Sequence, residues 1–194
     1  MRQPLTREAI SKAARDILVT EGLHAVSLRR VASSLGVTAP ALYAHVVDKR
    51  DLLQGIVEQE VEELQRRFAA VPEDDALDHL CGMAQAYIDY GLQNPDMFRA
   101  MFLFRPELTA EPRDEEPAHA SEIHAAFVDA VRKAELDGGD PELAALTIWT
   151  TAHGVITTLL IGPPLDIDLK NRLAQAAVNA AVTGLRNGSL LHAA

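Results

Sequence analysis

Three side chains that can bind phosphate lie close together in the segment TAPALYAHVVDK, residues 38–49. Tyr43 and His45 can donate hydrogen bonds to phosphate oxygens. Lys49 stands at the expected amino end of the following helix, where free backbone N–H groups also favour an anion. The segment is therefore suited to bind a phosphate backbone.

Small residues occupy the outer face of the helix that this segment predicts. Leu42 and Val46 face inward, and the opposite face carries Pro40, Ala41 and Ala44. Small outward residues allow a helix backbone to lie deep in a DNA major groove, where thymine methyl groups offer apolar contact.

Two short helices of about nine residues, joined by LGV (residues 35–37), must position these side chains. Gly36 allows the positive φ that a sharp turn needs, and Val37 can hold the turn against the core. The pattern predicts a helix-turn-helix. Short capped helix pairs also occur in proteins that never touch DNA, so the pattern alone leaves both interpretations open.

The rest of the periodic sequence also predicts helices, so the expected fold is all-α with about nine helices. Thr6, Ser27, Thr38 and Asp48 are expected N-caps, with Asp51 supporting the last. The expected helices after the turn cover residues 48–70, 75–94, 95–104, 121–136, 141–161 and 166–187. Residues 105–120, with three prolines and seven charges, predict a loop.

Charge is distributed unevenly along the 194 residues, whose formal net charge is -10. Residues 1–50 contain eight Lys or Arg and four Asp or Glu, whereas the remaining residues contain ten and 24. This asymmetry indicates a basic module that meets nucleic acid or an acidic surface, followed by a body with another task.

Other classes of protein fit the sequence less well. An enzyme is disfavoured because no glycine-flanked nucleophile, phosphate loop or metal spacing is present, and His119 and His124 lie five apart rather than four. We expect no catalytic residue, metal or cofactor. A purely structural helical adaptor is a second alternative, which the basic N-terminal module disfavours.

A membrane protein is also disfavoured. Residues 143–164 carry no charge, but five threonines interrupt them and no basic cluster flanks them. The first ten residues lack the apolar core of a signal peptide. The single cysteine, Cys81, excludes an intrachain disulfide framework and suits a reducing cytoplasm, which is the expected location.

The segment SLRRVASSLGVTAPALYAHVVDKRDLL, residues 27–53, resembles the DNA-binding domain of the tetracycline-repressor (TetR) family of bacterial transcription regulators. The family pattern places a small hydroxyl residue, then A, LGV, LY, H and K at these intervals. The resemblance implies a helix-turn-helix DNA-binding domain over residues 1–50 and a helical ligand-binding and dimerisation domain over residues 51–194. It also implies a repressor, or alternatively an activator or adaptor without a small-molecule inducer.

The resemblance assigns roles to individual residues. Arg29 would reach a base, with guanine O6 and N7 as the expected partners. The residues that would bind phosphates are Ser27, Thr38, Tyr43, His45 and Lys49. The residues that would line the major groove are Ala39, Pro40 and Ala41. Positions 39 and 41 often carry polar base-reading residues in the family, so weak base discrimination by this helix is expected.

WTTAHG, residues 149–154, resembles the W-x-x-x-H-G motif of a C-terminal ligand-domain subclass of the family. The resemblance implies a small organic effector, and bulky inward-facing side chains suit an adaptable pocket for an uncharged or weakly basic molecule. Any single one of them could equally be plain core. The candidates are Tyr87, Tyr90, Met97, Met101, Phe102, Phe127, Trp149 and His153.

Specific binding to DNA predicts a homodimer on a palindromic operator, because one recognition unit makes too few contacts. The last two helices are the expected dimer face, since the final helix carries a stripe of small residues that permits close approach. The stripe consists of Ala174, Ala177, Val178, Ala181, Val182 and Leu185. The same stripe could instead pack within one chain.

Overall fold

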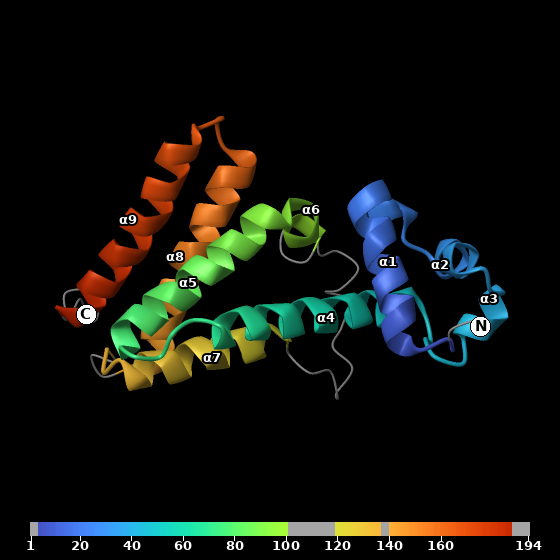
Figure 1. Ribbon diagram of the computed structural model, residues 1–194, viewed down its shortest axis with the longest axis horizontal. Helices are drawn as coiled ribbons and strands as arrows, with labels where there is room; N and C mark the ends of the chain where they lie inside the picture. The colour runs from blue at the N-terminus through green and yellow to red at the C-terminus, as the bar shows by residue number, and fades with distance from the viewer. Residues whose placement is uncertain (1–3, 101–118, 137–139, 188–194) are drawn as a thin grey trace. The chain divides into compact units, whose positions relative to one another are not determined.

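The computed structural model describes residues 4–100, 119–136 and 140–187 (Figure 1). Over these ranges the chain forms nine α-helices and one short 3-10 helix, without a strand. The predicted all-α fold is confirmed. Most of the predicted loop at residues 105–120 lies outside the described ranges, and α7 already begins at His119.

The described chain divides into two compact units. The first comprises residues 4–62 and 94–100, and the second residues 63–93, 119–136 and 140–187. Helix α4, Lys49–Ala69, belongs to the first unit up to Glu62 and to the second from Glu63. The division at residue 50 stays a proposal about function, since packing of the first unit continues beyond it.

Helix α1, Arg7–Glu21, opens the first unit and is followed by the 3-10 helix η1, Leu23–Ala25. Next come α2, Leu28–Leu35, α3, Ala39–Leu42, and the start of α4, while α6, Pro95–Phe98, packs against α1 from further along the chain.

Local sequence determines where these helices begin and end. The Thr6 hydroxyl accepts a hydrogen bond from the Ala9 N–H at 3.1 Å, and the Ser27 hydroxyl accepts one from the Arg30 N–H at 3.2 Å. Both residues are therefore N-caps, as predicted. Gly22 ends α1 with a φ of 86°, which few side-chain-bearing residues could adopt.

The core of the first unit joins α1, α2, α3, α4 and α6. Ile10, Val31, Leu42 and Ile56 are fully or almost fully buried in it. Met97 of α6 is 1% exposed and belongs to the same core. Its burial in the first unit gives Met97 a structural role that its apolar spacing alone did not predict.

The second unit is a helical bundle formed by the end of α4, α5 (Ala76–Gln93), α7 (His119–Lys133), α8 (Pro141–Ile161) and α9 (Ile167–Arg186). Helix α8 packs against α5, α7 and α9, and α8 and α9 lie side by side (Figure 1). Tyr87 and Phe127 are completely buried. At Gly91, any side chain would overlap Ile156, so glycine permits the close contact between α5 and α8.

The predicted stripe on α9 faces the interior of its own chain. Ala174, Val178, Ala181, Val182 and Leu185 are 2–8% exposed in the single chain, and Ala177 is half-buried. Small residues allow helices to pack closely whether the neighbour belongs to the same chain or to another. Here the neighbours of α9 are α5 and α8, so the assignment of this stripe to a dimer face was wrong.

Within the described ranges, α8 is the one helix long and apolar enough to cross a membrane by length and composition. A core helix of a soluble protein meets the same criterion, and 39% of the apolar window of α8 is buried within the chain.

Candidate nucleic-acid interface

Helices α2 and α3 form the predicted helix-turn-helix. Gly36 has a φ of 65° and a ψ of 31°, which is the left-handed conformation that glycine adopts without strain. The Val37 N–H donates to the Ala32 carbonyl at 3.0 Å, and Val37 packs half-buried against the core. The predicted turn at LGV therefore fixes the direction in which α3 leaves α2.

Helix α3 is shorter than predicted, with four residues in place of about nine. The chain continues as hydrogen-bonded turns, in which the His45 and Val46 N–H groups both donate to the Leu42 carbonyl, at 2.8 and 2.9 Å. Leu42 and Val46 are buried, as predicted. Tyr43 and His45 consequently lie on a turn rather than on a helix.

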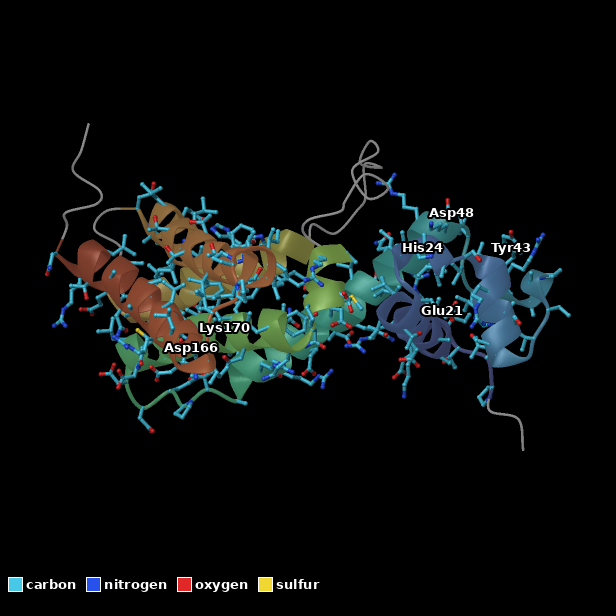
Figure 2. The ribbon with its side chains drawn as sticks, turned by 90° about the horizontal axis from the view of Figure 1, so that it is seen from above. Glu21, His24, Tyr43, Asp48, Asp166 and Lys170 are labelled. Carbon is cyan, nitrogen blue, oxygen red and sulfur yellow. The ribbon has the colours of Figure 1, made fainter. Side chains whose placement is uncertain are left out.

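Most of the predicted DNA-binding residues are accessible. Tyr43 is 58% exposed and projects outward (Figure 2). The full set divides into exposed residues (Arg29, Thr38, Pro40, Tyr43 and His45) and half-buried ones (Ser27, Ala39, Ala41 and Lys49). All of them belong to α2, α3 and the adjoining turns, except Lys49, which begins α4.

The two hydroxyl residues differ in their local hydrogen bonds. Ser27 caps α2 through its oxygen, which leaves its hydroxyl proton able to donate elsewhere. Thr38 stands at the N-cap position of α3, but its side chain makes no capping hydrogen bond with the described residues, so the predicted cap is wrong in that respect. Its exposed hydroxyl can serve an external acceptor.

The adjacent arginines Arg29 and Arg30 also differ. Arg30 forms an exposed ion pair with Glu21, whose two oxygens it reaches at 2.5 and 3.2 Å. This pairing lowers the pKa of Glu21. Arg29 is exposed and has no ion-pair partner among the residues that the structure describes. The geometry thus separates an arginine used within the chain from one available to a ligand.

Asp48 and Asp51 hold the start of α4 in a reciprocal arrangement. The Asp51 N–H donates to Asp48 Oδ1 at 2.9 Å, and Asp51 Oδ2 accepts from the Val47 N–H at 2.7 Å. The predicted cap and its support by Asp51 are confirmed, and the arrangement is similar to a capping box, with the Asp51 carboxylate bound to the N–H of the residue before the cap. Asp51 also binds Arg7, a contact that local sequence patterns do not reveal because the residues lie 44 apart.

The candidate effector residues are distributed unequally. Tyr87, Tyr90, Phe127, Trp149 and His153 belong to the second unit, whereas Met97 belongs to the core of the first. Met101 and Phe102 lie outside the described residues. The Arg67 guanidinium lies over the Tyr90 ring in a cation–π contact, 5.4 Å from the ring centre.

Tyr87, Trp149 and His153 form a polar cluster inside the second unit. The Tyr87 hydroxyl lies 3.0 Å from His153 Nδ1, and the Trp149 and His153 ring centres are 5.5 Å apart. Burial raises the pKa of the Tyr87 hydroxyl. The indole N–H is buried and makes no hydrogen bond of ordinary geometry with the described residues. The cluster can therefore accept a further hydrogen-bonding group.

Lowering the pH below about 6.5 should destabilise the chain through His153. Burial lowers the pKa of His153 from its ordinary value of 6.5, so the unfolded chain binds this proton more readily than the folded chain. The free energy of unfolding is retained above about pH 6.5 and falls as the pH decreases below it. Urea unfolding at about pH 7.5 and about pH 5.5 should show a smaller difference for His153→Gln than for the wild type. The exposed His24 gives the control, His24→Gln, and identical pH profiles for both variants would contradict this assignment.

No group of three His, Cys, Asp or Glu side chains that could hold a metal ion occurs within the described ranges.

Two family models match the chain. The model of bacterial regulatory proteins of the tetR family matches residues 10–56, which contain the helix-turn-helix. The model of the tetracyclin repressor-like C-terminal domain matches residues 80–181, which contain the WTTAHG motif.

Individual relatives agree with these matches. An HTH-type transcriptional regulator of Mycobacterium tuberculosis, described as uncharacterized, is 32% identical over 169 residues, which cover 84% of this chain and 74% of the relative. A protein with unknown function from Rhodococcus sp. RHA1 has the same fold, with a TM-score of 0.70 at 22% identity over 96% of each chain. The structure of a TetR/AcrR-family transcriptional regulator from Thermobifida fusca YX-ER1 matches with a TM-score of 0.64 at 23% identity, over 94% of this chain and 97% of that regulator. The chain belongs to the tetracycline-repressor (TetR) family, a non-enzymatic family of helix-turn-helix transcriptional regulators.

Proposed function

We propose that this regulator is a repressor that binds a palindromic operator as a homodimer and leaves it when a small organic effector binds. The observation that carries the DNA-binding part is the exposed set of donors around α3, which includes Thr38, Tyr43 and His45. Their position on one helix-turn-helix, within the basic N-terminal region, supports contact with two phosphate backbones flanking a major groove. The cytoplasm is the corresponding location.

Within this proposal, phosphate contacts supply affinity and few side chains read bases. Ser27, Thr38, Tyr43, His45 and Lys49 are the proposed phosphate ligands, and Arg29 is the proposed guanine reader. Ala39, Pro40 and Ala41 would line the groove and offer only apolar contact. Sequence-dependent DNA shape should therefore contribute much of the selectivity.

Arg29→Ala and Lys49→Ala should weaken binding in different ways. Arg29→Ala should cost about 1–3 kcal/mol on the operator and relax the preference for one guanine. Lys49→Ala should weaken binding to all sequences alike and reduce the slope of log K against log salt by about one. Fluorescence anisotropy on operator and scrambled duplexes at several salt concentrations measures both effects. If Arg29→Ala lost affinity equally on both duplexes, Arg29 would be a phosphate contact.

The proposed dimer face is the outer surface of α8 and α9, in place of the buried stripe. The exposed positions of α8 after its first turn carry no charge, and Leu143, Leu146 and Ile161 are 45%, 40% and 64% exposed. On α9, the exposed residues of the middle turns are also small or uncharged, namely Gln175, Ala176, Asn179, Ala180 and Thr183. An uncharged surface of this extent favours a protein partner. A second copy fits because palindromic operators require two-fold symmetry.

The polar cluster of Tyr87, Trp149 and His153 supports an effector site in the second unit. The lowered pKa of His153 keeps its ring neutral near pH 7, and the Trp149 N–H offers a donor. An uncharged organic molecule with a hydrogen-bond acceptor matches these groups.

Trp149 provides a direct test of the effector site because it is the only tryptophan in the chain. A screen of uncharged organic compounds should find one that both changes Trp149 fluorescence and releases operator DNA. His153→Gln should then raise the concentration needed for release. A confirmed inducer that leaves Trp149 fluorescence unchanged, and releases His153→Gln at the same concentration, would place the site elsewhere.

A further inference from the structure

The turn that carries the proposed phosphate ligands needs support from outside α3. Helix α3 ends at Leu42, and α4 begins at Lys49. His45 lies between them on non-helical backbone, and its side chain is exposed. Leu42 and Val46 anchor one side of the turn in the core, but they do not hold the backbone of residues 45–48 from the other side.

Arg7, in the first turn of α1, reaches this turn in two ways. Its Nη1 donates to the His45 carbonyl at 3.3 Å, and its Nη2 binds Asp51 Oδ1 at 2.6 Å. The second Asp51 oxygen accepts the Val47 N–H at 2.7 Å. One guanidinium and one carboxylate therefore join α1, the backbone on both sides of Val46, and the first turn of α4. We call these two residues the Arg7–Asp51 clamp.

The position of Arg7 is unfavourable for α1 considered alone. A cation in the first turn of a helix opposes the helix dipole, which favours acidic residues there. Two carboxylates compensate the charge, since Glu58 Oε2 also lies 3.8 Å from Arg7 Nε. The forked guanidinium suits this place because it can bind a carbonyl and a carboxylate at the same time.

We propose that Arg7 and Asp51 are positioning residues for DNA recognition, which hold His45 and Lys49 in the geometry that binds the phosphate backbone. Neither residue needs to touch DNA for this role. The inference rests on the proposed phosphate contacts of His45 and Lys49. It extends the interface to the start of α1, which lies outside the helix-turn-helix.

Asp51→Asn distinguishes positioning from simple electrostatics, because the two explanations predict opposite changes in operator affinity. Removing a negative charge near DNA should strengthen binding if only the electrostatic field matters. If the clamp positions the turn, the neutral amide holds Arg7 more weakly, and operator affinity should fall about tenfold. Anisotropy on operator duplex, with circular dichroism and thermal melting of the full chain to verify folding, measures the effect. Tighter binding by a folded Asp51→Asn variant would overturn the proposal.

Arg7→Lys is the second variant, and it keeps the positive charge while removing the fork. Positioning predicts that it weakens operator binding with little change in the salt slope, whereas a direct phosphate contact by Arg7 would be largely preserved by lysine. The matched control is Lys12→Gln, which removes an exposed charge from the same helix without disturbing the clamp. Wild-type operator affinity for Arg7→Lys would also overturn the proposal. So would an Arg7→Gln variant that loses no more operator affinity than the Lys12→Gln control measured beside it.

A double-mutant cycle separates failure of the clamp from failure of the phosphate assignment. If the clamp acts through His45 and Lys49, Arg7→Lys should have a much smaller effect in a His45→Ala, Lys49→Ala background. Additive effects would overturn the clamp. If the variant with both His45→Ala and Lys49→Ala binds the operator with wild-type affinity, His45 and Lys49 are not phosphate ligands. That result would refute the phosphate assignment whatever the affinities of the clamp variants.

Discussion

Gly154→Arg is expected to abolish specific operator binding and to leave the individual chain folded. Gly154 lies in the middle of α8 on the proposed dimer face and is exposed, and a Cβ at this position would have no heavy atom of the described residues within 4 Å beyond its own stretch of helix. An arginine side chain can therefore leave the helix without meeting the described residues at its Cβ, and arginine favours the helical conformation more than glycine does. In a dimer, the same side chain would place a charge at the closest approach of two copies.

The expected size of this effect follows from the need for two half-sites. A monomer retains one recognition unit, so its affinity for the operator should approach its affinity for unrelated DNA, a loss of about 10³-fold or more. Sedimentation velocity should show a monomer at micromolar concentration, and anisotropy should show the loss. The control is Ala125→Arg, which adds the same charge at an exposed position of α7. A Gly154→Arg protein that still sediments as a dimer would refute the proposed face.

Local sequence predicted much of the first unit because its signals act over a few residues. The Thr6 and Ser27 caps and the glycines at positions 22 and 36 determine helix ends through contacts within one turn. Helix spacing likewise identified Leu42 and Val46 as inward-facing. The length of α3 was not predictable in this way, because no glycine or proline marks the point at which it becomes a turn.

Features that depend on distant contacts could not be obtained from spacing. The small-residue stripe on α9 predicts close packing against another helix, but it does not show whether that helix belongs to the same chain. Met97 follows the apolar spacing of the middle helices, although its side chain completes the core around α1. In the sequence, Arg7 is an ordinary basic residue and Asp51 supports a helix cap. Only the folded structure shows that the two side chains bind each other.

The second large effect concerns the buried ion pair that joins α1 to α4. Arg15 Nε binds Glu60 Oε1, and Arg15 Nη2 lies 3.4 Å from the Asn94 side-chain oxygen, just before α6. The Glu60 side chain is 3% exposed, whereas that of Arg15 is 31% exposed. A carboxylate at this depth depends on its cation, because burial removes most of its hydration.

Arg15→Met should therefore lower the free energy of unfolding by about 3 kcal/mol, near the lower end of the range for broken buried pairs, because Arg15 itself is partly hydrated. Arg15→Met combined with Glu60→Met should recover much of the loss, since no uncompensated charge then remains in the core. Urea unfolding of the full chain at neutral pH measures both variants. Arg30→Met is the matched control, since it breaks the exposed pair with Glu21 on the same unit and should change stability little. If the Arg15 and Arg30 variants lost equal stability, burial of Glu60 would not be what makes its ion pair important.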